Sequence, residues 1–342
     1  MIFNRKRATD PTPLEGVDLV LADLDGVVYK GADAIPHAIE SINTAAASVR
    51  VGYITNNASR TAASVAEHLT SLGLDVAADD VVTSPQAGMR VLKGLIADGS
   101  TVLVIGGEGI TYELEKSGYV VTRSALDKPA AVIQGFSPDV GWVHLAEAAF
   151  ALHEVDGEPE VPWVATNTDW TIPVARGIAP GNGTLVSAVH TAIGRLPIVA
   201  GKPEVPMFDV ARERFASQRA LVIGDRLDTD ILGANRAGIA SVVVLTGIDQ
   251  AKQVLAAVPE QRPTFILDDL RQLLEPYPAT IEEKRGASFV TTVGDCVVVR
   301  TAETLVVEKQ GTAINRLRAG AAAIWGSGSA IYGLRVPPEL YS

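Results

Sequence analysis

Two carboxylates stand one residue apart in the sequence Asp23-Leu24-Asp25-Gly26, directly after an apolar run that begins at Leu19. Such a run is typical of a buried strand, and side chains two residues apart on an extended chain share one face. Carboxylates at a buried strand end are costly unless a cation or a proton lies between them. A second interpretation stays open here, in which Asp25-Gly26 is only a turn and Asp23 only a cap.

Three further segments carry polar residues at the ends of apolar strands or ahead of a helix. Thr55 and Asn56 end a second strand, Lys202 precedes a helix, and three acids follow a third apolar strand. These acids are Asp225, Asp228 and Asp230. Because the carboxyl ends of parallel strands meet at one edge of a sheet, we expect all of these residues to converge with the first two carboxylates.

Together the converging residues supply the parts of a phosphoryl transfer. Asp23 is the candidate nucleophile, which would form an aspartyl-phosphate. Asp25 is the candidate acid that protonates the leaving oxygen and the base that later takes a proton from water. Mg²⁺ prefers a few carboxylates together with water and phosphate oxygens, and its candidate ligands are Asp23, Asp25 and Asp225. Such a metal lets a carboxylate approach an anionic phosphate.

The other residues of the set suit phosphate binding and charge balance. Thr55, Asn56 with its neighbouring backbone N–H groups, and Lys202 are candidates to hold the phosphoryl oxygens. Asp228 and Asp230 are expected either to ligate the metal or to orient its waters and the lysine from the second shell.

The order of the elements predicts a doubly wound α/β core that is interrupted by a second domain. Strands and helices alternate up to about residue 93, which is the signature of a parallel sheet. We expect a Rossmann-like core in residues 1–93 and 198–277, with an inserted α/β cap in residues 94–197. The glycine-rich residues 106–109 do not match G-x-G-x-x-G, and they predict a tight turn.

The C-terminal residues 278–342 differ in character from the rest of the chain. Short apolar segments at 289–293, 297–300 and 305–307 predict a small antiparallel meander, and the alanine-rich segment 313–325 predicts a helix. We find no catalytic constellation in this part. The sequence therefore predicts a small α+β appendage that serves packing or interaction.

The four segments resemble the motifs of the haloacid-dehalogenase-like (HAD) phosphohydrolase superfamily. More narrowly, residues 23–29, 55–57, 201–203 and 224–231, with the large insert between them, are similar to its class IIA, p-nitrophenylphosphatase-like subfamily with a C2-type cap. The resemblance implies a Rossmann-like core, Mg²⁺ dependence and a cap that selects the substrate. The positions that match the family's functional residues are Asp23, Asp25, Thr55, Lys202, Asp225 and Asp230, the last acting directly or through water.

The substrate is the open point among phosphatases. The C-terminal extension is similar to that of actinobacterial glycerol-3-phosphate phosphatases, so glycerol 3-phosphate or 2-phosphoglycolate is preferred. Pyridoxal 5'-phosphate, sugar phosphates and nucleoside monophosphates are alternatives, and a catalytically silent binding or regulatory protein is an alternative of another class. In the cap, Asp169 and Arg176 are candidate substrate contacts, and a solvated loop arginine is an equally open interpretation of Arg176.

Composition excludes several other classes of function. A formal net charge of -11 and a pI near 5.0 disfavour a nucleic-acid or anionic-membrane surface. No segment is apolar for long enough to span a bilayer, and the basic residues 1–7 are not followed by the apolar part of a signal peptide. The single cysteine, Cys296, excludes an internal disulfide.

We expect a cytoplasmic protein that acts on a small phosphorylated metabolite. A homodimer is open because relatives commonly pair through their caps.

Overall fold

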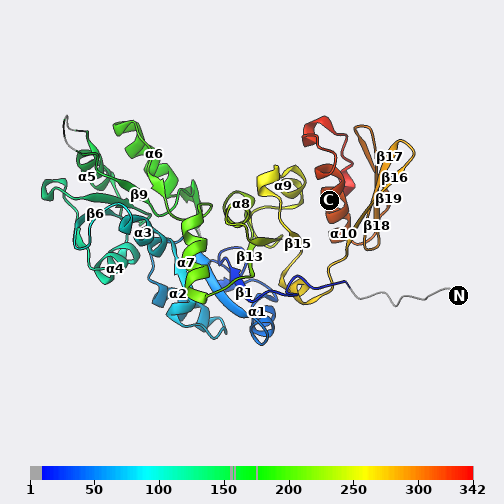
Figure 1. Ribbon diagram of the computed structural model, residues 1–342, viewed down its shortest axis with the longest axis horizontal. Coiled ribbons are helices and arrows are strands. Elements are labelled where there is room, and N and C mark those ends of the chain that lie inside the picture. The colour runs from blue at the N-terminus through cyan, green and yellow to red at the C-terminus, as the bar shows by residue number, and fades with distance from the viewer. Residues whose placement is uncertain (1–9, 155–156, 158, 175, 342) are drawn as a thin grey trace.

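The computed structural model of the chain describes residues 10–154, 157, 159–174 and 176–341, and the basic residues 1–7 lie outside these ranges. Three regions follow one another along the long axis of the molecule, with the cap at one end, the core in the middle and the C-terminal extension at the other end (Figure 1). Within the described ranges, no helix combines the length and the apolar character that crossing a membrane requires.

The core contains a six-stranded parallel sheet in the order β15-β14-β13-β1-β4-β5. Its strands are β1 (Leu19–Ala22), β4 (Arg50–Thr55), β5 (Val81–Thr83), β13 (Ala220–Gly224), β14 (Ala240–Val244) and β15 (Phe265–Leu267). The strand β1 is buried along its whole length, as its apolar sequence predicts. It pairs with β13 on one side and β4 on the other, so the residues that follow these three strands lie side by side.

Helices cover both faces of this sheet, which confirms the doubly wound α/β architecture. They are α1 (Ala38–Ala46), α2 (Ala62–Ser71), α3 (Ser84–Lys93), α7 (Val205–Phe215), α8 (Leu232–Arg236) and α9 (Ala251–Ala256). Helices α1 and α2 share one buried apolar cluster with Val20 and Ala22. Helices α3, α7 and α8 share another with Leu19 and Leu21, because alternate residues of a strand face opposite sides. A two-stranded ribbon, β2 (Tyr29–Lys30) and β3 (Asp33–Ala34), follows the first strand.

The cap contains its own parallel sheet in the order β12-β9-β8-β6-β7. Its strands are β6 (Thr101–Ile105), β7 (Val120–Thr122), β8 (Ala131–Gln134), β9 (Trp163–Ala165) and β12 (Ile198–Val199), and its helices are α4 (Glu108–Lys116), α5 (Trp142–Leu152) and α6 (Asn182–Ile193). The predicted tight turn at 106–109 is present as a bend at Gly106, whose φ is +145°, but residues 108–109 already belong to α4, whose N-cap is Gly107. A hairpin of β10 (Thr171–Val174) and β11 (Gly177–Pro180) occupies the segment that was expected to be loop.

Cap and core share a hydrophobic cluster rather than meeting only at flexible linkers. Helix α3 contributes Ala87, Met89 and Leu92 to this cluster, which also contains Ile133 and Val164 of the cap sheet. The cap sheet includes β12, so it extends two residues beyond the predicted cap boundary at residue 197. We keep the division into core, cap and extension as a proposal, with this boundary moved past β12.

The C-terminal extension pairs four antiparallel strands in sequence order and packs one helix against them. The strands are β16 (Thr280–Arg285), β17 (Ser288–Val293), β18 (Cys296–Thr301) and β19 (Thr304–Lys309), and the helix is α10 (Ala313–Trp325). The last three strands and the helix agree with the predicted meander and helix. The strand β16 was not predicted, because all six of its residues are exposed and it shows no apolar alternation.

Candidate active site

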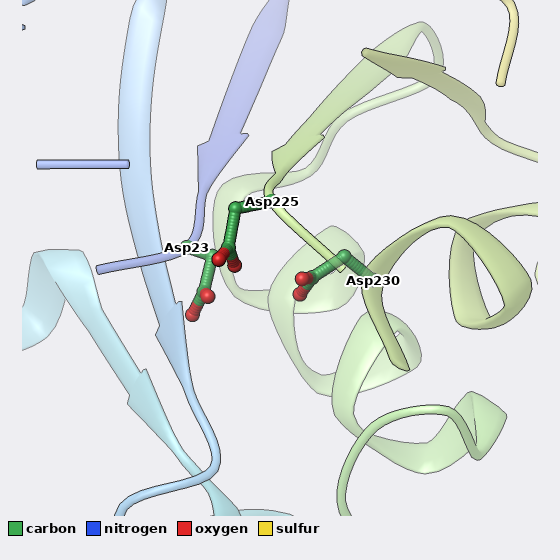
Figure 2. Close-up of side chains that lie close together, drawn as sticks. All are labelled: Asp23, Asp225 and Asp230. Atoms are coloured by element: carbon green, nitrogen blue, oxygen red, sulfur yellow. The ribbon is translucent and has the colours of Figure 1, made fainter. Parts of the chain in front are cut away.

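Three of the predicted residues lie at the carboxyl ends of three neighbouring strands of the core sheet. Asp23 follows β1, Thr55 is the last residue of β4, and Asp225 follows β13. The side chains of Asp23, Asp225 and Asp230 point toward a common space at this edge (Figure 2). One oxygen of each of these three carboxylates lies within 4.8 Å of the others. Convergence at the carboxyl edge of the sheet, expected from the strand order, is therefore present in the fold.

Lys202 links two members of this carboxylate group. Its Nζ donates to Asp23 Oδ1 at 2.6 Å and to Asp230 Oδ1 at 2.7 Å. Only 3% of the lysine is exposed, and Asp230 is fully buried. Burial alone would lower the pKa of the Lys202 ammonium, but the two carboxylates raise its pKa above the usual value. The lysine is therefore charged and balances one of the three acids.

The space around Asp225 depends on glycines. A Cβ atom at Gly247 would lie 1.9 Å from Asp225 Oδ2, and one at Gly26 would lie 2.3 Å from the same atom. Gly26 also has a φ of +83°, in the left-handed region that favours glycine. Gly224 makes room for the third carboxylate, since its Cβ would lie 2.1 Å from Asp230 Cβ. Side chains at these positions would fill the space that the acids occupy.

The electrostatics of the group favour a cation. Burial raises the pKa of the Asp23 carboxyl well above its usual range, the Lys202 ammonium counteracts this, and the other two acids add to it. Burial and then the charge of Asp230 raise the pKa of Asp225 to about 7. Three carboxylates against one ammonium leave an excess of negative charge, and their donor atoms are hard oxygens. Hard oxygen donors of this kind fit Mg²⁺.

Two of the predicted acids lie differently from what the sequence predicts. Asp230, expected either to ligate the metal or to act from the second shell, belongs to the carboxylate group, whereas the carboxylate of Asp25, expected among the metal ligands, does not. Asp228 points toward Arg226 and forms an ion pair with it, with Nη2 to Oδ2 at 2.8 Å. The reason is local. Residues 227–231, which we call the acidic turn, form a single wide helical turn, so Asp228 and Asp230 project in different directions.

Asp25 is exposed to solvent, unlike Asp23, Asp225 and Asp230. The chain turns sharply after β1, with Gly26 N–H donating to the carbonyl of Tyr29 at 2.9 Å. Although the residue is exposed, desolvation by the surrounding protein raises the pKa of the Asp25 carboxyl, and Lys202, Arg60 and His68 counteract this. A raised pKa keeps the proton on this carboxyl to higher pH, which suits a general acid.

Thr55 and Asn56 have different surroundings. Thr55 is 3% exposed, and its Oγ1 accepts a hydrogen bond from Asn57 N at 3.1 Å. The side chain of Asn56 contacts protein groups: Oδ1 accepts from Lys202 N at 2.9 Å, and Nδ2 donates to Lys202 O at 3.0 Å and to Asp169 Oδ1 at 3.1 Å. These bonds occupy its side-chain amide, so the backbone N–H of Asn56 is the group left for phosphate.

The two candidate cap residues are separated by the hairpin. Asp169 lies just before β10 and reaches the core through Asn56, whereas Arg176 lies exposed at the turn between β10 and β11. The structure therefore brings Asp169, but not Arg176, into contact with the site residues named above.

The loop after β14 was missed from the sequence. Ile248 N donates to Asp225 Oδ2 at 2.7 Å, and Asp249 Oδ2 accepts from Leu227 N at 2.7 Å. Thr246 Oγ1 also donates to Gly26 O at 2.7 Å. The available signal was the sequence Thr246-Gly247-Ile248-Asp249 directly after a buried strand, the same strand-then-polar pattern that located the other segments.

A doubly wound core with an inserted cap, carrying buried acids and a lysine at the edge of its sheet, defines a class of hydrolases. The haloacid dehalogenase-like hydrolase family matches residues 20–120, and the HAD-hydrolase-like family matches residues 199–273. The chain is 41% identical over 317 residues to the D-glycerol 3-phosphate phosphatase of Mycobacterium tuberculosis, covering 90% of this chain and 86% of that protein. The chain belongs to the haloacid dehalogenase-like hydrolase family.

Solved structures agree with this placement. A crystal structure of the glycerol phosphate phosphatase from M. tuberculosis in complex with magnesium has a TM-score of 0.80 and 38% sequence identity, covering 94% of each chain. The 4-nitrophenylphosphatase from Thermotoga maritima has a TM-score of 0.69 and 28% identity, covering 77% of this chain and 98% of its own. The second match confirms the predicted p-nitrophenylphosphatase-type fold. The first match extends over nearly all of this chain.

Proposed function

We propose that the protein is a Mg²⁺-dependent phosphomonoester hydrolase that works through an aspartyl-phosphate on Asp23. The observation that carries the proposal is the buried group of three carboxylates joined by Lys202 at the sheet edge, in a chain of the haloacid dehalogenase-like family. A catalytically silent binding protein would gain nothing from burying these charges, because unpaired buried acids destabilise a core.

In the proposed reaction, an oxygen of Asp23 attacks the phosphorus while the bond to the leaving oxygen breaks. No described residue donates a hydrogen bond to Asp23 Oδ2, so this oxygen is the one available for attack. Asp25 gives its proton to the leaving alcohol and then takes one from the water that attacks the aspartyl-phosphate, which regenerates the Asp23 carboxylate and the protonated Asp25. Thr55 and Lys202 hold the phosphoryl oxygens as charge develops on them.

The metal ligands that we propose are Asp23 and Asp225, with Asp230 acting directly or through water. Asp225 Oδ2 is fixed by Ile248 N, and Lys202 fixes Asp23 Oδ1 and Asp230 Oδ1, so the donors are already oriented. When bound, Mg²⁺ supplies positive charge that neutralises the carboxylates and the phosphate together. The structure of the M. tuberculosis relative with magnesium supports this choice of ion.

Glycerol 3-phosphate is the substrate that we propose first. This choice of substrate rests on the M. tuberculosis relative, which matches this chain over its core, cap and extension together. 2-Phosphoglycolate, pyridoxal 5'-phosphate, sugar phosphates and nucleoside monophosphates are the competing esters. Arg176, which lies exposed at the turn between β10 and β11, remains a proposed contact for an anionic group of the substrate.

The experiment that tests the proposal is phosphate release from this panel of esters, with and without Mg²⁺. We expect Mg²⁺-dependent release with a preference for glycerol 3-phosphate. The matched control is Asp23→Asn, which keeps the shape of the side chain and should lower turnover by at least about 1,000-fold because the nucleophile is lost. Turnover that survives this substitution would remove Asp23 from the role, and release from no ester would favour a binding protein.

We further propose that the protein is a cytoplasmic homodimer that pairs through its cap. The helix α5 supports this pairing, because Trp142, Val143 and Phe150 on it are 78%, 64% and 64% exposed. The single cysteine, Cys296, is buried and unpaired, which suits a reducing compartment. Sedimentation should give twice the chain mass, and Trp142→Lys should give the mass of a single chain.

A further inference from the structure

Asn56 is the one predicted site residue whose side chain connects the cap to the catalytic lysine. An asparagine side chain has one acceptor oxygen and two donor hydrogens. Oδ1 accepts from the backbone N–H of Lys202 at 2.9 Å, and Nδ2 donates to the carbonyl of the same residue at 3.0 Å. The remaining hydrogen of Nδ2 faces the Asp169 carboxylate, at 3.1 Å from Oδ1 and 3.3 Å from Oδ2. The amide is therefore bound to both backbone groups of Lys202 and to Asp169 of the cap.

The lysine end of this connection is tightly packed. A Cβ atom at Gly201 would lie 2.3 Å from Thr166 O and 2.6 Å from Asn56 Oδ1, so the backbone before Lys202 touches both the cap strand end and the asparagine. The side chain of Lys202 holds Asp23 and Asp230 at 2.6 and 2.7 Å. A shift of this backbone would therefore move the ammonium relative to both carboxylates.

The cap end of the connection is equally fixed. Asn167 Nδ2 donates to Asn56 O at 2.8 Å, and Asn167 Oδ1 accepts from Asp169 N at 3.2 Å. A Cβ atom at Gly181 would lie 2.2 Å from Asp169 O, so the loop before β10 lies directly against the start of α6. The carboxylate of Asp169 also interacts electrostatically with the guanidinium of Arg226, which is the N-cap of the acidic turn in the core.

We propose that Asp169 is a positioning residue that acts on Lys202 through Asn56, so that a correctly seated cap loop is required for a correctly placed catalytic lysine. This inference rests on the proposed phosphatase function. It differs from the role that the sequence predicts for Asp169, which is contact with the substrate. A substrate contact would discriminate between esters, whereas a positioning role affects the transfer of every phosphoryl group alike.

The first test compares kcat and KM of Asp169→Ala, Asp169→Asn, Asn56→Ala and the double alanine variant on glycerol 3-phosphate and p-nitrophenyl phosphate. Asp169→Ala should lower kcat by about 10- to 100-fold on both esters, a range usual for residues that orient a catalytic group, and should change KM little. Asp169→Asn should recover most of kcat, because its amide oxygen still accepts from Nδ2. The double variant should be no slower than Asn56→Ala, since both act through one contact.

The matched control is Glu115→Ala, which removes an exposed carboxylate from the cap helix α4 and should leave both constants unchanged. A loss confined to KM for glycerol 3-phosphate would overturn the proposal in favour of direct substrate contact. Losses that add in the double variant would also overturn it, because the two residues would then act independently.

A second test does not depend on turnover. Hydrogen exchange of the full chain should be faster in Asp169→Ala for the peptide that contains Lys202, whose amide is held by Asn56 Oδ1, and unchanged for peptides of β18. Unchanged exchange at Lys202 would contradict the coupling. A wild-type chain that hydrolyses neither ester would count against the proposed function, and the exchange result would still decide whether the cap loop fixes the lysine backbone.

Discussion

At the scale of single residues, the site depends as much on glycines, which have no side chain, as on acids. The Asp225 carboxylate occupies space left by Gly26 and Gly247, and its Oδ2 is held by the N–H of Ile248. An acid in so narrow a space has little freedom to turn. The orientation of Asp225, the proposed metal ligand, is therefore set by the surrounding backbone.

The substitution Gly247→Ala tests this dependence. Its Cβ would lie 1.9 Å from Asp225 Oδ2, so the carboxylate must move. We expect the Mg²⁺ concentration for half-maximal activity to rise by at least about tenfold. The matched control is Gly333→Ala in the C-terminal extension, where a Cβ meets nothing within 4 Å. Equal Mg²⁺ requirements in the two variants would show that the space around Asp225 is not needed.

The raised pKa of Asp225 predicts how pH and Mg²⁺ act on stability. Without metal, its pKa is about 7 in the folded chain against 3.8 as the ordinary value, so the folded state binds more protons between these values. This contribution to stability is complete below the lower value and is lost as pH rises through about 7. Mg²⁺ bound to the ionised carboxylates should restore the folding stability that their ionisation removes.

We therefore expect Mg²⁺ to raise the Tm by more at about pH 8 than at about pH 5.5, where protons compete with the metal. Thermal unfolding with a chelator and with excess Mg²⁺ at both pH values measures this difference. Asp225→Asn is the control, since it removes this titrating group and should weaken the dependence, which Asp23 alone then carries. An equal gain at both pH values would mean that Asp225 is already ionised in the metal-free chain.

At the scale of elements, the cap meets the core where α4 begins. A Cβ at Gly109 would lie 2.5 Å from Arg60 O and 2.7 Å from Ala58 O, so the first turn of this cap helix touches the loop that follows Thr55. Gly107 packs similarly, with its Cβ position 3.3 Å from Ser59 Cα. The glycine-rich segment 106–109 therefore allows the backbone of the cap to lie directly against the backbone of the core.

Gly109→Ala should move the cap away from the loop that follows Thr55. Because displacement of about 1 Å can lower a rate about 100-fold, we expect kcat/KM for glycerol 3-phosphate to fall by about 10- to 100-fold. Gly141→Ala, at the N-cap of α5, introduces a Cβ with nothing within 4 Å and should leave kcat/KM unchanged. Wild-type activity in Gly109→Ala would mean that the cap tolerates this shift.

The elements that sequence analysis predicted are those with buried, periodic apolar residues. The strands β1 and β13 and the helix α10 fall into this group. The helix α4 was missed because glycines at its start suggested a turn, and β10 was missed because its segment is rich in turn residues. The contact of Asn56 with Asp169 could not be predicted, because 113 positions separate the two residues and no local pattern records their approach.

At the scale of the whole molecule, the C-terminal extension shares a core with the acidic turn. One buried cluster contains Leu227 and Ile231, which flank Asp228 and Asp230, together with Val254 of α9 and Leu317 of α10. Arg318 adds a polar link, because its Nε donates to Ile266 O at 2.8 Å. Figure 1 places the extension on the side of the core away from the cap. The extension therefore packs against the acidic turn on the side of the core away from the cap.

Leu317→Ala tests this support with the extension still present. The side chain is 3% exposed, so its loss should lower the free energy of unfolding by about 2–5 kcal/mol. Because the same cluster packs Leu227 and Ile231, the Mg²⁺ requirement should rise while KM for the ester changes little. Removing residues 278–342 would be a weaker test, since the exposed cluster would favour aggregation.

Val306→Ala is the matched control for this prediction, because its side chain is 55% exposed in the same extension and should cost no more than about 0.5 kcal/mol. Urea unfolding and Mg²⁺ titration of activity measure the two effects on the same samples. If Leu317→Ala lowers stability but leaves the Mg²⁺ requirement at the wild-type value, the extension is packed on the core without influence on the acidic turn. A lower free energy of unfolding together with a higher Mg²⁺ requirement would mean that the C-terminal extension helps to hold the acids of the proposed active site.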